Sequence, residues 1–255
     1  MKGSNEAYVT QVVKNRIATI EFFHPAHNSL PSDLLQRLSE EITLAGKNDQ
    51  VHFIILRSGG NRTFCAGASF NELAAIQDQK SGKKFFSGFA KVINAIRNCE
   101  KIVIGRIQGK AVGGGVGLAA ACDYPLASKF ASIRLSELAI GIGPFVIGPV
   151  VERKVGLAAF SQLALNPSEW QTAGWAKDRG LFFESFDSNE QLDDYIKYYS
   201  DKLLNYSPLA LAEMKKILWE GTNHWDELLD NRAALSGRLI LSHHARKAIN
   251  SFLSA

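Results

Sequence analysis

The sequence is poor in cysteine and has no metal-binding pattern. Its three cysteines, Cys65, Cys99 and Cys122, are widely spaced, and no CxxC pair or cysteine–histidine cluster occurs. Zinc sites need several closely placed ligands, and disulfide frameworks need paired cysteines in an oxidising compartment. We therefore expect reduced thiols, a cytoplasmic location and no metal ion.

Dense basic blocks and long apolar runs are also missing. The formal net charge is +4 over 255 residues, which suits an anionic small ligand better than a nucleic acid. The apolar stretch 111–121 is too short and too rich in glycine to span a membrane. The first residues, MKGSNEAYVTQ, lack the apolar centre of a signal peptide. We expect neither a nucleic-acid partner nor a membrane association.

Hydrophobic spacing predicts strands that alternate with helices. Apolar runs typical of strands are followed by segments in which apolar residues recur at helical spacing. Strands are expected over 8–13, 17–23, 53–56, 102–107 and 124–127, and helices from about 31 to 42 and from 85 to 96. Strands separated by helices predict an α/β core with parallel pairing.

The pattern changes near Gln191, beyond which only helices are expected. Apolar faces recur in three segments, Leu192/Ile196/Leu203, Leu211/Met214/Ile217/Leu218 and Leu228/Leu229/Leu235/Leu239. Such helices need the core or a neighbouring subunit to cover them. We expect an α/β core over 1–190 and a helical region over 191–255.

Two segments rich in glycine and alanine each follow a predicted buried strand and enter a predicted helix. One is RTFCAGASFNELAAI (62–76), whose helix should begin near Ser69 or Phe70, and the other contains Gly113, Gly114 and Gly115. Unpaired N–H groups at the start of a helix can bind an anion or a developing oxyanion. Close helix–strand packing explains either segment alone equally well, but two of them in one chain favour a function.

Other glycine-rich motifs fit the sequence less well. Residues 115–120 satisfy GxGxxA, and Glu137 lies near the offset of a ribose-binding acid, as in a Rossmann dehydrogenase. That interpretation leaves FCAGA unexplained. The absence of GK[ST] after the glycines and of GxSxG excludes a P-loop and a nucleophile elbow.

The pairing of FCAGA with VGGGVGLAAACD, together with HPAHNSLP and SELAIGIGPF, resembles the enoyl-CoA hydratase/isomerase (crotonase) superfamily. The resemblance covers most of the chain. It implies an α/β fold built as a spiral of ββα units, with a helical C-terminal region used in trimer formation. It also implies acyl-CoA thioester substrates, no cofactor other than the coenzyme A of the substrate, and a homotrimer or a dimer of trimers.

By position, the resemblance places the thioester oxygen between the backbone N–H groups of Ala68 and Gly114. An enolate formed from the thioester would be stabilised there. The implied substrate-binding residues are Phe64, Cys65, Ala66, Gly67, Ala68, Gly113 and Gly114.

One acid of the family's hydratase pattern is absent. Hydratases of this family resemble one another in having two glutamates, and the first falls at Gly117 here, whereas the second is present as Glu137. A single base suits proton transfer from C2 to C4 of a 3-enoyl-CoA better than water addition. We therefore expect an enoyl-CoA isomerase with Glu137 as acid and base, and burial should raise its pKa. A surface role for Glu137 is the alternative.

Several alternatives stay open from the sequence. A hydratase of fatty-acid or branched-chain degradation, another enolate chemistry such as decarboxylation or thioester hydrolysis, and a non-catalytic binder of CoA or RNA all remain. Cys65 could be reactive or simply small. Lys215 and Lys216 could meet CoA phosphates or form a solvated helix face. The stripe Phe85/Phe86/Phe89 could line an acyl pocket or pack in the core, and His243 and His244 have no assigned role.

Overall fold

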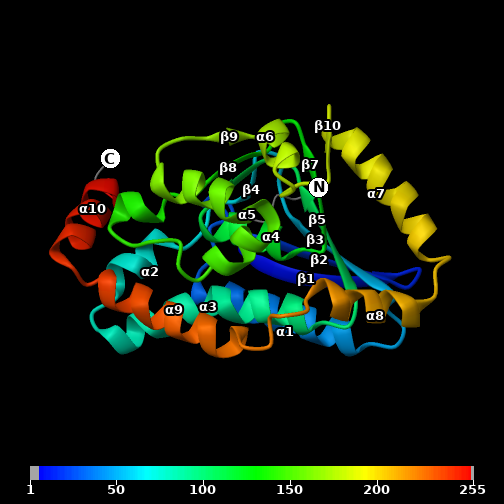
Figure 1. Cartoon of the computed structure of the whole chain (residues 1–255), viewed down its shortest axis with the longest axis horizontal. Coiled ribbons are helices and arrows are strands. Elements are labelled where there is room, and N and C mark those ends of the chain that lie inside the picture. Colours follow the sequence, from blue (N-terminus) through cyan, green and yellow to red (C-terminus); the bar gives the residue numbers. More distant parts are fainter. Residues whose placement is uncertain (1–5, 254–255) are drawn as a thin grey trace.

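Two β-sheets form the centre of the computed structural model, which describes residues 6–253 (Figure 1). The larger sheet has the order β1-β2-β3-β5-β7-β10. Strands β1 and β2 pair antiparallel, and every other pair is parallel. Its strands are β1 (Tyr8–Lys14), β2 (Ile17–Phe23), β3 (Phe53–Ser58), β5 (Ile102–Ile107), β7 (Tyr124–Ser128) and β10 (Glu184–Phe186). The predicted α/β core with a first hairpin and parallel pairing is confirmed.

The smaller sheet carries the segments that lead into the site. Its order is β4-β6-β8-β9, with β9 antiparallel to β8 and the other pairs parallel. The strands are short: β4 (Thr63–Cys65), β6 (Lys110–Val112), β8 (Ser132–Arg134) and β9 (Gln171–Thr172). Strands this short are not distinguished from loops by hydrophobic spacing, and the sequence analysis did not predict them.

Strand β3 shows how the large sheet is buried on both faces. Ile54 and Leu56 point into the main hydrophobic cluster, whereas Phe53 belongs to a second cluster on the other face. This second cluster consists of Phe53, Ile102, Ile104, Leu126, Leu192, Ile196 and Leu203. Parallel strands covered on both sides give continuous apolar runs, as the sequence has here.

Helices surround the sheets. Local signals set their ends: the side chain of Asp78 forms a capping box with Ser81 at the start of α3, and Ser69 caps α2. The helices before the C-terminal region are α1 (Ser32–Lys47), α2 (Phe70–Ala75), α3 (Gln79–Asn98), α4 (Gly114–Ala121), the 3₁₀ helix η1 (Glu137–Ile140), α5 (Gly148–Leu165) and α6 (Ala173–Asp178). None of the helices in the described range is both long and apolar enough to cross a membrane.

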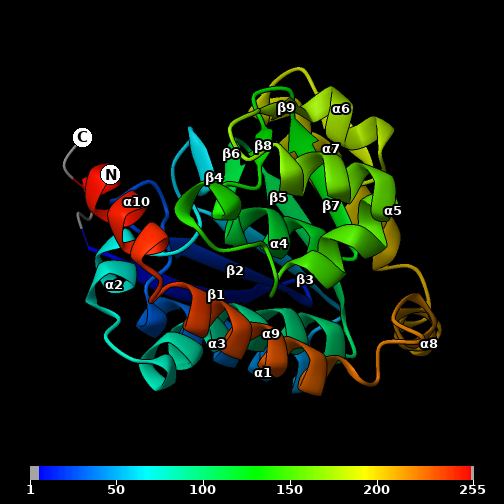
Figure 2. The same cartoon turned by 60° about the vertical axis from the view of Figure 1, so that its left-hand side comes forward.

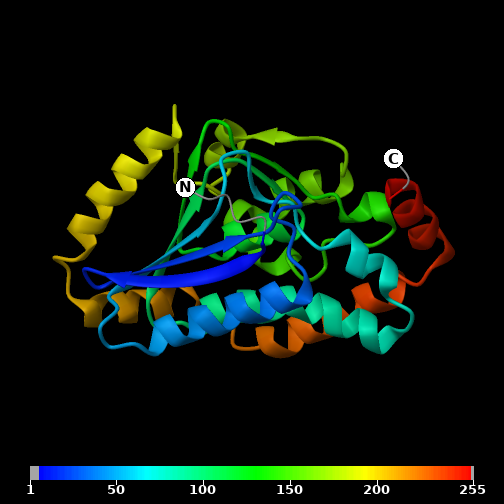
Figure 3. The same ribbon diagram turned by 180° about the vertical axis from the view of Figure 1, so that it is seen from behind.

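The C-terminal helices α7 (Asn189–Leu203), α8 (Pro208–Leu218), α9 (Trp225–Leu239) and α10 (His243–Leu253) return to the core of the same chain. Helix α9 lies along α3, where Arg97 forms an ion pair with Asp226 and donates to the Thr222 carbonyl. Helix α10 reaches α2 at one end of the molecule (Figure 2), and Arg246 donates to carbonyls at the end of α2. In the view from behind, the β1–β2 hairpin and α1, both in blue, lie toward the viewer (Figure 3). The division into 1–190 and 191–255 stays a prediction.

The expected role of Lys215 is wrong. Its side chain is 2% exposed, and its Nζ atom donates to the carboxylate of Asp123 at a distance of 2.5 Å. It therefore neither faces solvent nor can meet a phosphate. Met214, Ile217 and Leu218 are instead partly exposed on α8, together with Leu209. Of the apolar face that the spacing indicated, Leu211 packs against the second cluster, whereas the other three residues do not face the core.

Candidate active site

The two glycine-rich segments lie against each other. A Cβ atom at Gly67 would come within 2.8 Å of the Val112 carbonyl oxygen and 3.6 Å of the Gly114 nitrogen. The backbones of the FCAGA segment and of the triplet Gly113–Gly115 are therefore in contact, although they lie far apart in sequence. This contact is what the pairing of the two motifs predicted.

The Gly114 N–H group is the first of helix α4. Gly113 precedes it with φ +51° and ψ −117°, a conformation that favours glycine. Its own N–H donates to the Arg134 carbonyl at 2.9 Å. Gly114 donates to no group of the described chain, so its N–H remains available to a ligand at the positive end of α4.

The Ala68 N–H group lies just before helix α2, whose start agrees with the prediction. Helix α2 begins at Phe70 with Ser69 as its cap, so Ala68 lies before the helix rather than in its first turn. Ala68 instead forms a parallel bridge with Leu30. Within residues 6–253 its N–H also donates to no protein group. The donor is therefore held by the 24–31 loop, which the sequence analysis left without a role.

Glu137 lies at the start of η1 beside this pair of donors. Its Oε1 atom is within 2.7 Å of the position that a Cβ atom would take at Gly113, so any side chain there would displace the carboxylate. The residue as a whole is partly exposed, but Oε2 is buried and has no hydrogen-bond partner among residues 6–253. Burial raises the pKa of Glu137 to about 7, and a hydrogen bond with its own backbone opposes this shift. The carboxyl group can thus both take and return a proton near neutral pH.

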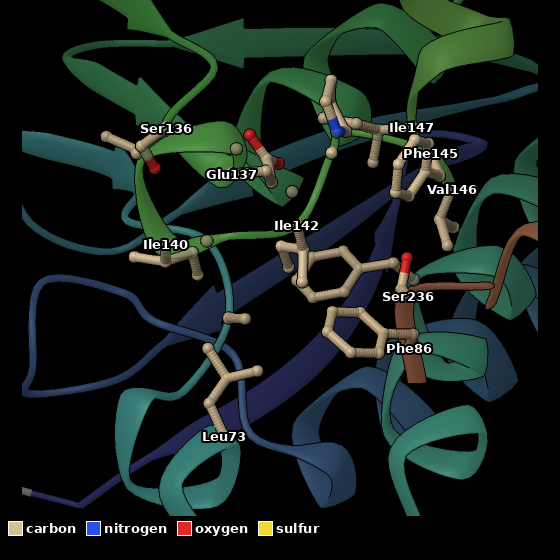
Figure 4. Close-up of a pocket in the computed structure, with 18 of the residues that line it drawn as sticks. Leu73, Phe86, Ser136, Glu137, Ile140, Ile142, Phe145, Val146, Ile147 and Ser236 are labelled. Carbon is tan, nitrogen blue, oxygen red and sulfur yellow. The ribbon is translucent and has the colours of Figure 1, made fainter. Parts of the chain in front are cut away.

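A cavity of about 60 Å³ connects Glu137 with the two donors (Figure 4). Figure 4 shows Glu137 on one side, Ile142 in the middle and Leu73 and Phe86 on the far side. Glu137 is the single titratable side chain among the lining residues, which are Ala66, Gly67, Ala68, Phe70, Leu73, Phe86, Phe89, Val112, Gly113, Gly114, Ser136, Glu137, Ile140, Ile142, Gly143, Pro144, Phe145, Val146, Ile147 and Ser236. An apolar chain fits these walls, with its reacting end near Glu137.

The position of the absent acid, Gly117, is occupied by another side chain. Gly117 is buried within α4, and a Cβ atom there would collide with Cγ2 of Ile147. Ile147 itself lines the cavity. No second carboxylate can extend from this position without moving Ile147. The same burial excludes the dinucleotide motif, because Gly115 and Gly117 face the protein interior rather than a ligand.

Not all of the implied binding residues line the cavity. Ala66, Gly67, Ala68, Gly113 and Gly114 do. Phe64 and Cys65 do not: both are fully buried, and Phe64 packs edge-to-face against Phe22. Their side chains do not reach the cavity, because both pack in the main hydrophobic cluster.

The other candidate residues also differ in whether they line the cavity. Burial raises the pKa of the Cys65 thiol to about 12, which disfavours a reactive thiolate. Phe86 and Phe89 line the cavity, and Phe85 packs in the core. His244 packs against Gly141 at the end of η1. Lys216 is exposed and pairs with Glu213.

Ile147 and Ser236 line the cavity and were missed by the sequence analysis. Ile147 follows the recognised SELAIGIGPF segment, so its proximity in sequence was the available signal. Ser236 comes from α9, and nothing in its local sequence indicates that this helix reaches the cavity of the core.

Comparison with known proteins gives one consistent family. The model of the enoyl-CoA hydratase/isomerase family matches residues 13–254. The peroxisomal Delta(3,5)-Delta(2,4)-dienoyl-CoA isomerase of Arabidopsis thaliana is 29% identical, with 96% of this chain and 95% of that protein covered. A probable enoyl-CoA hydratase of Bacillus subtilis is 27% identical over the same shares.

The fold is shared with solved structures. An enoyl-CoA hydratase from Bacillus halodurans superposes with a TM-score of 0.88 at 23% identity, covering 96% of this chain and 99% of the other. The predicted crotonase-like α/β fold is confirmed. The chain therefore belongs to the enoyl-CoA hydratase/isomerase family of enzymes.

Proposed function

We propose that this enzyme shifts the double bond of a 3-enoyl-CoA thioester to the 2,3 position. The thioester oxygen accepts hydrogen bonds from the N–H groups of Ala68 and Gly114. The acyl chain runs along the apolar wall toward Leu73 and Phe86. The pantetheine arm enters past the Ala66–Ala68 segment.

The Glu137 carboxylate performs both proton transfers. It removes a proton from C2, and the C–H electron pair forms the C1=C2 double bond of a dienolate. The π pair of the thioester carbonyl moves onto the oxygen, which carries the negative charge. The carboxyl group then gives the proton to C4, where the C3=C4 electron pair forms the new C–H bond. The C1=C2 pair moves to C2=C3, the charge on the oxygen returns to re-form the thioester carbonyl, and the carboxylate is regenerated. Each fixed N–H donor lowers the barrier by about 2.7–4 kcal/mol because the charge develops on the oxygen that it faces.

The observation that carries the proposal is the single carboxylate of the cavity. Glu137 is the one titratable group among the lining residues, and Ile147 fills the space in front of Gly117. Water addition needs a group that holds the water molecule as well as a proton donor. Isomerisation needs one base that reaches two carbons.

The test is a direct comparison of two substrates. We expect the enzyme to convert a 3-enoyl-CoA to its conjugated isomer, followed by the rise in ultraviolet absorbance, and to hydrate a 2-enoyl-CoA much more slowly. Faster hydration than isomerisation would overturn the proposal.

Hydration is the second candidate. Ser136 lines the cavity directly before Glu137, and its hydroxyl group could hold a water molecule in place of the absent acid. Several relatives carry hydratase names, including the short-chain-enoyl-CoA hydratase of Clostridium acetobutylicum at 28% identity. Loss of hydration but not of isomerisation in Ser136→Ala would support this second activity.

The remaining expectations are also proposals. We propose a homotrimer or a dimer of trimers, supported by the exposed apolar residues Leu209, Met214, Ile217 and Leu218 of α8, and light scattering in solution tests it.

We propose that catalysis needs no cofactor beyond the substrate's coenzyme A, since the two steps are proton transfers, and activity should persist in a chelator. A cytoplasmic location, supported by three buried unpaired cysteines, is tested by cell fractionation.

A further inference from the structure

The loop between β2 and α1, residues 24–31, runs alongside the segment that presents the Ala68 N–H group. The backbone carbonyl of His27 accepts a hydrogen bond from the Ala66 backbone N–H at 3.2 Å, and the Leu30 backbone N–H donates to the Gly67 carbonyl at 2.8 Å. The loop therefore forms hydrogen bonds with the backbone polar groups on one side of this segment. The Ala68 N–H group points away from it.

The bond to Gly67 acts on the oxyanion donor itself. The Gly67 carbonyl and the Ala68 N–H group belong to one planar peptide unit and point in opposite directions. The N–H of Leu30 thus fixes the direction of the Ala68 N–H from the far side of the same plane. Hydrogen bonds in such a chain also polarise one another, which makes the Ala68 N–H a stronger donor.

The position of Leu30 depends on two residues in an uncommon conformation. His27 and Asn28 have φ values of +55° and +56°. Residues other than glycine adopt this left-handed region when the surrounding structure holds them there, and asparagine tolerates it better than most. The 3% exposed side chain of Asn28 supplies the restraint.

The Asn28 amide uses all of its principal groups to hold the loop. Its Nδ2 atom donates to the carbonyls of Gly59 and Thr63, both at 2.8 Å, and its Oδ1 accepts from the His24 nitrogen at 2.9 Å. Gly59 and Thr63 bound the turn between β3 and β4, so one side chain ties this turn to the 24–31 loop. Gln108 donates to the Thr63 carbonyl as well, but its side-chain hydrogen bonds go to Ser58, Gly60 and Thr63 rather than to the 24–31 loop.

We propose that Asn28 is a positioning residue that orients the Ala68 N–H group through Leu30 and the Gly67 carbonyl. The inference rests on the proposed function, in which Ala68 binds the thioester oxygen. Asn28 touches neither the substrate nor Glu137. Its effect should therefore show in the polarisation of the bound carbonyl and in kcat more than in KM.

Asn28→Asp tests the proposal because it keeps the size of the side chain and the acceptor for the His24 backbone N–H, but replaces the two N–H donors by at most one O–H donor. The matched control is Leu203→Ala, which destabilises the second cluster far from the site. Both variants are compared with the wild type for kcat, KM, thermal stability and the carbonyl stretching frequency of bound 2-hexenoyl-CoA.

In Asn28→Asp we expect the carbonyl frequency to move toward its value in free thioester and kcat to fall about 10- to 100-fold, less than the roughly 10²- to 10³-fold cost of deleting a donor. Leu203→Ala should lose stability without either change. Should Asn28→Asp fail to fold, Asn28→Gly keeps the left-handed backbone without the donors and should give the same shift.

An unchanged carbonyl frequency and kcat in a folded Asn28 variant would overturn the inference. Failure of the proposed function has a different signature. It would appear in the wild type as absent isomerisation, while the frequency difference between wild type and variant on bound thioester would still decide the role of Asn28.

Discussion

At the scale of single residues, Glu137 combines its proposed catalytic role with a cost to folding. Its carboxylate sits in an apolar cavity without a cation beside it, so its ionised form is poorly solvated. The same burial that raises its pKa to about 7 makes it a base that can release its proton again. Activity and stability should therefore respond to pH in opposite ways.

The activity of the enzyme should follow the ionisation of Glu137. In the proposed mechanism only the carboxylate form removes the C2 proton, so kcat/KM should rise with pH and level off above about 7. Glu137→Gln should lower kcat by about 10²- to 10⁴-fold with binding of the product retained. The control is Glu213→Gln, an exposed residue paired with Lys216, whose profile should match the wild type. A profile with its inflection near 4.5 would contradict the assignment.

The stability of the fold should change in the other direction. The native state holds its proton up to a pKa of about 7 and the unfolded state only up to 4.5, so the free energy of unfolding should fall as pH rises between these values. Glu137→Gln cannot ionise and should not show this loss. The stability of the variant relative to the wild type should therefore increase by roughly 3 kcal/mol from pH 4.5 to pH 8. Urea unfolding at the two pH values measures this change. An equal difference at both pH values would show that Glu137 is not desolvated.

At the scale of secondary-structure elements, the contact between α4 and the start of α5 determines how many carboxylates the cavity can hold. Gly117 of α4 faces Ile147, which directly precedes α5. The absence of an acid at 117 was visible in the sequence. The reason why none fits was not, because Ile147 comes from a separate turn of chain.

A double-mutant cycle tests this contact. Gly117→Ala should destabilise the enzyme by about 1–3 kcal/mol, because its Cβ atom would overlap Cγ2 of Ile147. Ile147→Ala should cost about 2–5 kcal/mol by leaving a gap. In the double variant the added methyl group occupies part of that gap, so the loss should be smaller than the two losses combined. Additive losses in urea unfolding would mean that the two side chains do not share this space.

Sequence patterns predicted the elements better than their contacts. Helix α2 begins at Phe70 after its Ser69 cap, as the small residues of FCAGAS indicated. The hydrogen bonds of the 24–31 loop, the arrival of Ser236 from α9 and the burial of Lys215 were not predictable. Each depends on residues distant in sequence, and hydrophobic spacing reports only on neighbours along one helix or strand.

At the scale of the whole molecule, one buried carboxylate joins the C-terminal helix α8 to the core. Asp123 follows α4 and accepts hydrogen bonds from the Val103 nitrogen, the Lys215 ammonium and the Trp219 indole. Its three donors come from β5, from α8 and from the residue that ends α8. The pair Asp123–Lys215 is almost fully buried, with side chains 3% and 2% exposed.

Removal of one member of this pair should therefore loosen α8. Lys215→Met leaves the Asp123 carboxylate buried without its cation and should cost about 3–5 kcal/mol in unfolding free energy. The neighbouring Lys216→Met removes an exposed pair with Glu213 and should leave the free energy of unfolding almost unchanged. Combining Lys215→Met with Asp123→Asn removes both charges, so the double variant should be more stable than Lys215→Met alone.

Hydrogen exchange of α8 supplies the second readout. If the ion pair anchors this helix, exchange should be faster throughout α8 in Lys215→Met but not in Lys216→Met. If the two single variants were equally stable, α8 would be held by its apolar contacts, and the buried pair would contribute no net stability.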